Sequence, residues 1–355
     1  MTSISWTDAT WNPIVGCSIV SKGCTNCYAM LMAARLEAMA EAGQPGLVHY
    51  AGTTERAKTG AVWTGKIGIA PHSTLIQPMR WKKSRMIFVN SMSDLFHPDV
   101  TDAQRDRIFA VIALTPHHTY QILTKRPEIA REYLKGRWQI RILDIMRDLG
   151  KIPNDTGVLL HTVNGGKLPN VWLGVSIEDQ ATANQRIPIL LDTPAAIRWV
   201  SAEPLLGPVN LREIDIDGHF TIDALAPASS QECWDSDWEP ESHGTTFEEA
   251  QEGFREQFGH WPPNNARGPK LDQVVTGGES GRSRKRIRPT HHTWSTSLRD
   301  QCADTSTAFF YKQAGSWRHD HDLPDGGERF TWTGGHGSDL LDGVKHHNWP
   351  AARAA

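Results

Sequence analysis

The sequence lacks a long apolar segment. No stretch of its 355 residues approaches the roughly 18 consecutive apolar residues that a membrane-spanning helix needs. Residues 1–8 also lack a basic segment followed by an apolar run, which is the pattern of a secretory signal peptide. We therefore expect a cytoplasmic protein with no membrane partner.

Cysteine is scarce, and its count is odd. The chain has five cysteines, of which Cys233 and Cys302 lie far from the other three. A disulfide-stabilised scaffold needs a denser and even set of cysteines. The pattern therefore excludes a disulfide framework and favours a reducing compartment.

A large net charge is also missing. Lysine and arginine number 37 and aspartate and glutamate 40, so the formal charge is −3. No overall field attracts a polyanion, and any contact with DNA or RNA must depend on a local basic patch. Tyrosine is scarce as well, with five against 14 tryptophans, and we expect most of the tryptophans to be packing anchors.

The segment 12–30 carries the remaining cysteines. Cys17, Cys24 and Cys27 lie within eleven residues. Three thiolates on one loop suit an iron–sulfur cluster better than a disulfide, because Cys24 and Cys27 are close enough to ligate one metal centre and the third can close over it. One iron of such a cluster would lack a protein ligand.

Two alternatives stay open for this loop. A structural zinc site would use the same cysteines and a fourth ligand, such as a histidine from elsewhere, because structural zinc is almost always four-coordinate. The cysteines would otherwise only pack in a core, which the interposed Gly, Ser, Lys and Asn residues do not favour.

Apolar, β-prone segments alternate with amphipathic segments along the rest of the chain, and each expected strand ends in polar residues. We expect strands at 85–90, 118–123, 171–176, 197–201, 272–276 and 308–312, and helices at 28–41, 101–114, 128–134, 180–191 and 293–304. Weaker patterns predict a strand at 66–70 and helices near 73–82 and 246–258. Five or six strands separated by helices predict an α/β fold, with a parallel sheet curled into a partial or complete (β/α) barrel. Such barrels carry their chemistry at the carboxyl ends of the strands.

The same patterns predict the domain organisation. The barrel is expected to occupy residues 1–320, with surface insertions at about 136–170 and 215–270. The second insertion is acidic and rich in Trp and Pro, and it lacks the apolar density of an independent core. Residues 321–355 are rich in Gly, His and Asp and are expected to form a peripheral tail.

The sequence around the cysteines is similar to that of a known superfamily. Asn12-Pro13, Gly16-Cys17 and Cys27-Tyr28-Ala29 resemble the cysteine loop of radical S-adenosylmethionine (SAM) enzymes, and most closely that of the spore-photoproduct-lyase-like branch. The usual superfamily spacing is Cys-x3-Cys-x2-Cys, whereas this chain has six residues between its first two cysteines. The resemblance implies a barrel of radical SAM type.

Further blocks extend over most of the chain. Those at 6–13, 88–97, 122–127, 172–176, 203–208 and 277–281 resemble, in order, a phage-associated family of unknown function. That family occurs in bacteria and their phages, and its members are described as three-Cys-motif proteins encoded beside a dedicated partner protein. The resemblance implies such a partner. It also supports a third hypothesis, a phage-defence or phage-encoded subunit that is active only with its partner.

The superfamily resemblance implies a chemistry. Three cysteines would hold a [4Fe–4S] cluster whose open iron takes SAM, and one electron would cleave the sulfonium bond to give a 5′-deoxyadenosyl radical. The resemblance also implies the residues that bind SAM: Ser91, Ser93 and Asp94 at the methionine amino end, Ser176 and Glu178 at the ribose, and Lys125 or Arg126 at the SAM carboxylate or a substrate phosphate. At each position a salt bridge or a loop cap is the open alternative.

Five cations follow the last of these blocks. Arg282, Arg284, Lys285, Arg286 and Arg288 lie within seven residues of a net acidic chain. A patch of this kind predicts contact with a phosphate backbone, so we expect a nucleic acid or a nucleotide as the substrate. A solvated basic turn is the alternative for this segment. For the whole protein the alternative function is a zinc-stabilised nucleic-acid-binding module without catalysis.

Overall fold

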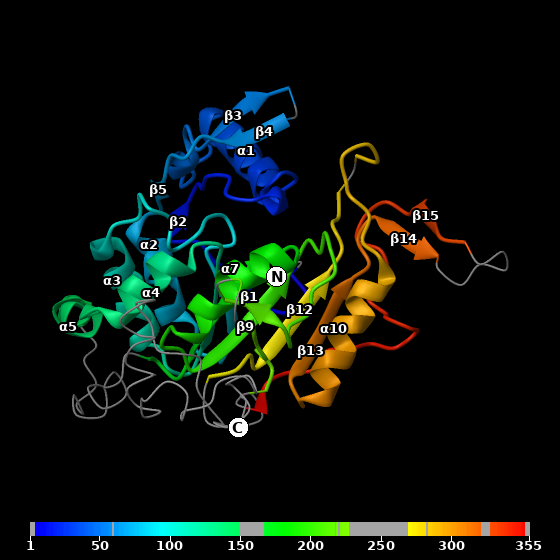
Figure 1. The fold of residues 1–355 in the computed structure, drawn as a ribbon. Helices are drawn as coiled ribbons and strands as arrows, with labels where there is room; N and C mark the ends of the chain where they lie inside the picture. The colour runs from blue at the N-terminus through cyan, green and yellow to red at the C-terminus, as the bar shows by residue number, and fades with distance from the viewer. Residues whose placement is uncertain are drawn as a thin grey trace, which may run out of the picture.

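Seven strands form one parallel sheet, and they cross it in chain order (Figure 1). The computed structural model describes residues 4–58, 60–149, 167–216, 218, 221–226, 269–281, 283–320 and 327–351. The strands are β1 (Ala9–Trp11), β6 (Met86–Val89), β7 (Thr119–Thr124), β8 (Val171–Ile177), β9 (Ile197–Ala202), β12 (Gln273–Gly277) and β13 (Ala308–Gln313). Every residue of β6 and β8 is buried, as expected for a parallel sheet that is covered on both faces.

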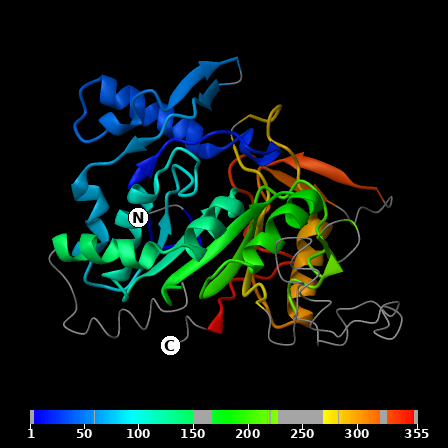
Figure 2. The ribbon, with the colours of Figure 1, turned by 60° about the vertical axis from the view of Figure 1, so that its left-hand side comes forward.

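The sheet curls into a half-barrel (Figure 2). In the described part of the chain its two edge strands, β1 and β13, do not pair with each other, so the barrel is partial. The predicted α/β fold with a partial parallel barrel is confirmed, with seven strands where five or six were expected. The additional strand is β1, whose three residues are too few to show a strand pattern in the sequence.

Helices cover the outer face of the sheet (Figures 1 and 2). They are α3 (Asp102–Ala113), α4 (Pro127–Lys135), α5 (Trp138–Asp148), α7 (Gln180–Leu191) and α10 (His292–Asp304). Capping boxes at Thr101 and Asp179 begin α3 and α7, because each side chain accepts the amide of the third helical residue. The helices expected at these places are therefore present.

The described part of the first expected insertion, 136–170, consists mostly of α5. Its Trp138 is fully buried and packs against Phe109 and Tyr133, so this helix contributes to the main core. Residues 150–166 and 227–268, which include the helix expected at 246–258, lie outside the described residues.

The face of the sheet opposite the helices is filled by aromatic side chains. Trp6, Phe88, Trp172, Trp199 and Phe310 belong to one buried cluster. The indole of Trp199 lies over β8 at Gly174, where an added Cβ atom would be only 2.5 Å from the ring. A glycine at this position therefore lets the large side chain fill the inner layer of the barrel.

The last described residues cover the free edge of β13. The amide of Tyr311 donates to the carbonyl of His346 at 2.8 Å, and the amide of Asn348 donates to the carbonyl of Phe309 at 3.0 Å. Trp349 then packs against the inner aromatic cluster, 5.4 Å from the ring of Phe310. These residues belong to the stretch expected to form a peripheral tail, 321–355.

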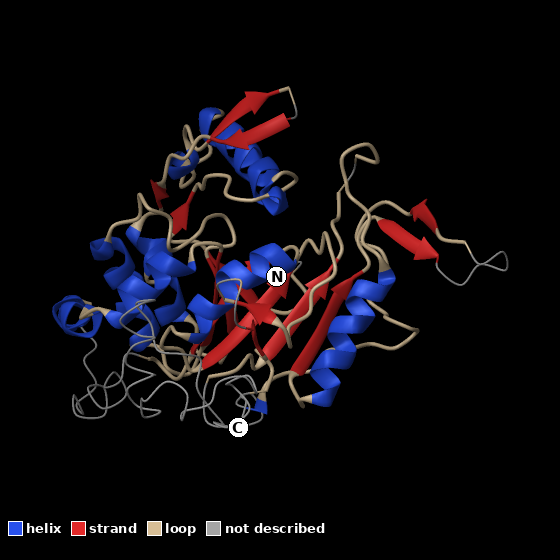
Figure 3. Ribbon diagram, viewed as in Figure 1, coloured by secondary structure: helices blue, strands red, loops and turns tan. Residues whose placement is uncertain are grey.

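Smaller elements lie beyond the carboxyl ends of the strands (Figure 3). They include α1 (Tyr28–Glu41), which has the expected bounds, and the paired strands β2 (Ile14–Val15) with β5 (Gly68–Ile69), β3 (Thr54–Ala57) with β4 (Gly60–Trp63), and β14 (Trp317–Asp320) with β15 (Arg329–Trp332). One more pair, β10 (Ile214–Asp215) with β11 (Thr221–Ile222), follows β9 in the chain. The strand expected at 66–70 is thus a two-residue strand.

The helix expected near 73–82 is interrupted. It consists of α2 (His72–Leu75) and a separate 3-10 turn (Gln77–Arg80), because Pro78 has no amide hydrogen to continue an α-helix. Two other 3-10 turns span Lys22–Cys24 and Val48–Tyr50. Among all described helices, none is both long and apolar enough to cross a lipid bilayer.

Candidate functional site

A pocket of about 260 Å³ lies at the carboxyl edge of the sheet. The ends of six strands and the cysteine loop (residues 16–27) meet there, although they are spread over most of the chain. Its lining includes Cys17, Cys24, Cys27, Ser91, Ser93, Asp94, Lys125, Arg126 and Ser176. The fold therefore brings nearly all of the predicted metal and SAM-binding residues to one place.

The cysteine loop begins against the loop that follows β6. The amide of Gly16 donates to the carbonyl of Met92 at 3.0 Å, and the carbonyl of Cys17 accepts the amide of Gly65 at 3.2 Å. Gly16 has a φ of +88°, and an added Cβ atom would lie 2.1 Å from the carbonyl oxygen of Lys66. Only glycine meets both conditions, so this residue sets the direction in which the cysteines enter the pocket.

Burial favours the neutral thiol form of Cys17 and Cys27. Burial raises the pKa of Cys17 to about 12, and the nearby carboxylate of Asp94 adds to the shift. Burial also raises the pKa of Cys27. Because only thiolates ligate metals, binding a metal here would release protons.

The donor set fits a cluster better than a single zinc ion. Among the described residues, the one group of three Cys, His, Asp or Glu ligands that all lie within 4.8 Å of one another is His291, His319 and Glu328. At least two of the three cysteine sulfurs are therefore more than 4.8 Å apart. Tetrahedral zinc with bonds of about 2.3 Å would place its sulfur ligands only ~3.8 Å apart. The described lining of the pocket also contains no histidine to serve as a fourth zinc ligand. Three cysteine ligands are the number that a [4Fe–4S] cluster with one open iron requires.

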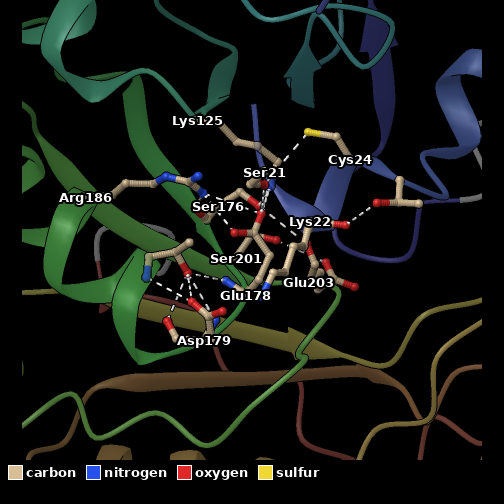
Figure 4. A network of polar contacts seen from close by, with 12 residues as sticks. Ser21, Lys22, Cys24, Lys125, Ser176, Glu178, Asp179, Arg186, Ser201 and Glu203 are labelled. Carbon is tan, nitrogen blue, oxygen red and sulfur yellow. Dashed lines mark hydrogen bonds and ion pairs between the residues drawn. The ribbon is translucent and has the colours of Figure 1, made fainter. Parts of the chain in front are cut away.

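Three groups of polar contacts, which we call latches, hold the cysteine loop against the strand ends. The first latch is centred on Glu178, which follows β8 (Figure 4). Its carboxylate is 1% exposed and accepts the hydroxyl of Ser21 at 2.9 Å. It is also ion-paired with Lys125 and, at 3.1 Å, with Arg186. An added Cβ atom on Gly23 would lie 2.4 Å from this carboxylate, so the loop rests directly on it. Glu178 was predicted to bind ribose and Lys125 to bind an anion, and in the structure they form an ion pair with each other.

The second latch is the ion pair of Asp94 and Arg126 at 2.9 Å. The guanidinium donates to the hydroxyl of Ser18 at 2.8 Å and approaches the sulfur of Cys17 at 3.8 Å. Asp94 also accepts the hydroxyl of Thr124 at 2.8 Å. Both charged groups, predicted to contact SAM, thus position the first cysteine.

The third latch follows β12, where Glu279 pairs with Arg288. Glu279 accepts the amide side chain of Asn26 at 3.1 Å, and Arg288 donates to the carbonyl of Lys22 at 2.9 Å. Together the three latches join the cysteine loop to the ends of β7, β8 and β12.

The three serines predicted to bind SAM form hydrogen bonds with neighbouring groups of the protein. Ser91 donates to the side-chain oxygen of Asn12 at 3.1 Å, and Ser93 donates to the carbonyl of Ile14 at 3.0 Å. The hydroxyl oxygen of Ser176 accepts a hydrogen bond from the ammonium of Lys125 at 2.6 Å. A direct role of these three residues in binding SAM stays a prediction.

Three of the predicted cations are exposed on a turn next to the pocket. Arg284, Lys285 and Arg286 lie between Glu279 and Arg288 of the third latch, and Arg284 stacks over the ring of Trp317. The carbonyl of Arg286 accepts the side-chain amide of Asn26, which lines the pocket, at 2.8 Å. Trp317 also donates to the carbonyl of Ile287 at 2.7 Å, which fixes the turn. Arg288 belongs to the third latch, and Arg282 lies outside the described residues.

Sequence reasoning missed several residues of the pocket. Glu203 after β9, Lys312 on β13 and Glu279 line it, and Asn90 at the end of β6 lies there with a left-handed φ of +57°. In the described part of the chain the side-chain amide nitrogen of Asn90 is buried without a hydrogen-bond partner. The available signal was the polar residue at each strand end, which indicates a place at the carboxyl edge but not what the side chain contacts.

The comparisons with known proteins are as follows. A family model described as "Protein of unknown function (DUF5131)" matches residues 1–350. No curated protein matches the chain. One solved structure, titled "Spore photoproduct lyase complexed with dinucleoside spore photoproduct", is similar with a TM-score of 0.32 and 10% sequence identity. The match covers 90% of this chain and 66% of that one, just under two thirds of its length.

Proposed function

The family match spans nearly the whole chain, so the protein belongs to that family of unknown function, and we propose that it is a radical SAM enzyme. The observation that carries the proposal is the trio of Cys17, Cys24 and Cys27 beside a pocket at the carboxyl edge of a partial parallel barrel. A reduced [4Fe–4S] cluster held by these thiolates would supply the electron that cleaves the sulfonium bond of SAM.

The surrounding residues support this role. Arg126 lies 3.8 Å from the sulfur of Cys17, where its charge would stabilise the thiolate. The apolar side chains of Trp6, Phe88 and Leu123 line the pocket and would keep water from a reactive species. The unpaired amide of Asn90 would donate a hydrogen bond to the bound ligand.

The first experiment is metal analysis after anaerobic reconstitution with iron and sulfide. We expect about four irons per chain and broad visible absorbance. Replacing Cys17, Cys24 or Cys27 by Ala should abolish both, whereas Cys302→Ala and Cys233→Ala should retain them. Cys302 is a matched control because it is a buried free thiol that does not line the pocket. Stoichiometric zinc without iron would instead support the zinc-stabilised module.

We extend the proposal to the substrate, a nucleic acid or nucleotide. Arg284, Lys285 and Arg286 are exposed, and within the described part of the chain none of them is ion-paired. Their turn lies next to the pocket, because the carbonyl of Arg286 accepts the side-chain amide of Asn26, which lines it, at 2.8 Å. Three unpaired cations beside the pocket match the phosphates of a polyanion. A cytoplasmic location, one barrel unit over residues 1–320 and a dedicated partner protein complete the proposal.

The second experiment measures the affinity for a labelled single-stranded oligonucleotide as a function of salt. Replacing Arg284, Lys285 and Arg286 by Gln should flatten the slope of log affinity against log salt by about two units. Each phosphate contact releases counterions when it forms, so losing three contacts removes their share of the salt dependence. Lys82→Gln with Lys83→Gln is the control, since both lysines are exposed before the amino end of β6. An unchanged slope in the triple variant would assign the basic turn to solvent.

A further inference from the structure

Among the described residues, Asp94, Glu178, Glu203 and Glu279 have carboxylates near the carboxyl ends of β6, β8, β9 and β12, and the protein itself supplies most of the donors to three of them. Asp94 accepts the amides of Phe96 and Lys125 in addition to Thr124 and Arg126. Glu178 accepts from its serine and two cations, and Glu279 accepts three donors of Arg288 in addition to Asn26. A carboxylate has about four lone-pair sites, so Asp94 and Glu279, with four donors each, are closed to a ligand. Glu178 has three donors, but it is 1% exposed and is not among the residues that line the pocket.

The fourth carboxylate, Glu203, is different. One oxygen is ion-paired with Lys312 at 3.0 Å, and the other accepts the hydroxyl of Ser201 at 3.2 Å. Within the described part of the chain no further donor reaches it, so about two lone-pair sites stay open. Its side chain is 13% exposed, and both Glu203 and Lys312 line the pocket. Glu203 is therefore the carboxylate that a ligand in the pocket can reach.

The backbone makes room for this pair. Glu203 follows β9 and Lys312 lies on β13, so their ion pair crosses the intervening strand β12. It crosses at Gly277, where an added Cβ atom would lie 2.7 Å from the Glu203 carboxylate and 3.4 Å from the Cβ atom of Lys312. Any larger residue at 277 would displace the carboxylate. The glycine thus preserves a group that faces the pocket.

A carboxylate with two open acceptor sites complements a pair of neighbouring hydroxyls. The ribose of a nucleoside offers such a pair, and carboxylates bind it in this way in nucleotide-binding folds. The aromatic side chains of Trp6, Phe88 and Tyr28 also line the pocket and provide apolar surface for a base. We infer that Glu203, held by Lys312 and Ser201, binds the ribose hydroxyls of a nucleoside in this pocket. This inference rests on the proposed function, because SAM contains an adenosine.

The test is nucleoside binding to the cluster-free protein, measured by calorimetry or ligand-observed NMR. Adenosine should bind, and 2′,3′-dideoxyadenosine should bind about tenfold to a hundredfold more weakly, as expected for losing hydrogen bonds to a charged group. Glu203→Gln should weaken adenosine binding by a similar factor and should remove most of the difference between the two nucleosides.

Two further variants make the result specific. Gly277→Ala should reproduce the loss without changing any charge, whereas Glu132→Gln, an exposed carboxylate on α4, should bind adenosine like the parent. Thermal unfolding of each variant verifies that it is folded.

Several outcomes would overturn the inference. Adenosine and its dideoxy analogue could bind the parent equally, or adenosine could fail to bind at all. Free methionine could be the ligand that depends on Glu203, which would assign the carboxylate to an ammonium group. Iron loading of the same variants separates this inference from the proposed function. A protein that binds adenosine through Glu203 but never holds iron would retain the nucleoside site and lose the radical chemistry.

Discussion

At the scale of single residues, the inner layer of the barrel depends on one glycine. Trp199 is fully buried, and its ring lies where the side chain of any other residue at 174 would lie. Gly174→Ala should lower the free energy of unfolding by about 1–3 kcal/mol, because overpacking displaces a large ring. Urea unfolding followed by tryptophan fluorescence measures this change. Gly207→Ala is the control, since its added Cβ atom would make only an ordinary contact at 3.4 Å. Equal losses in the two variants would contradict the packing argument.

A buried histidine should give the protein a pH-dependent stability. His118 donates to the carbonyl of Pro78 at 3.1 Å, and burial lowers its pKa below the ordinary value of 6.5. Above pH ~6.5 the ring is neutral in both the folded and the unfolded chain, so it contributes no pH dependence. Below that value the unfolded chain takes up the proton first. The free energy of unfolding therefore decreases as the pH is lowered, by at most about 1.4 kcal/mol per pH unit.

The corresponding variant is His118→Gln. Its urea midpoint should fall less steeply than that of the parent between pH 7 and pH 5, although its stability at pH 7.5 should be lower because packing is lost. Parallel pH profiles of the two proteins would show that His118 is not the titrating group.

At the scale of elements, the cysteine loop owes its position to the three latches more than to its own turns. The loop rests on Glu178 so closely that Gly23 has no room for a side chain. Gly23→Ala should therefore lift the loop, speed hydrogen exchange across residues 17–27 and reduce iron loading by severalfold. Lys22→Ala is the control on the same loop, because its exposed side chain can be removed while its carbonyl still accepts from Arg288. Exchange rates like those of the parent in Gly23→Ala would reject the latch.

At the scale of the whole molecule, the half-barrel is completed by the end of the chain. Residues 346–348 cover the edge of β13, and half-buried Trp349 packs on the inner aromatic cluster. Trp349→Ala should cost about 1–3 kcal/mol of stability in urea unfolding, less than a fully buried tryptophan. Val344→Ala, an exposed position in the same segment, should be neutral within about 0.5 kcal/mol. A neutral Trp349→Ala variant would show that this segment is only peripheral.

The sequence by itself determined the order of strands and helices, the parallel sheet and the closely spaced cysteine trio. These features depend on local information: apolar runs mark β6 to β9, β12 and β13, and the spacing of Cys17, Cys24 and Cys27 marks the loop. β1 escaped detection because three residues carry too short a pattern.

Only the tertiary structure decided what the charged strand-end residues contact. Glu178 and Ser21 are 157 positions apart, and Glu279 and Asn26 are 253 positions apart. A residue type shows that a carboxylate needs a partner, but a buried charge pairs with whichever donors the fold brings beside it. In the fold, Asp94, Glu178 and Glu279 pair with groups that hold the cysteine loop. Glu203 stays open to the pocket, because Gly277 leaves room for its carboxylate and only two donors reach it among the described residues.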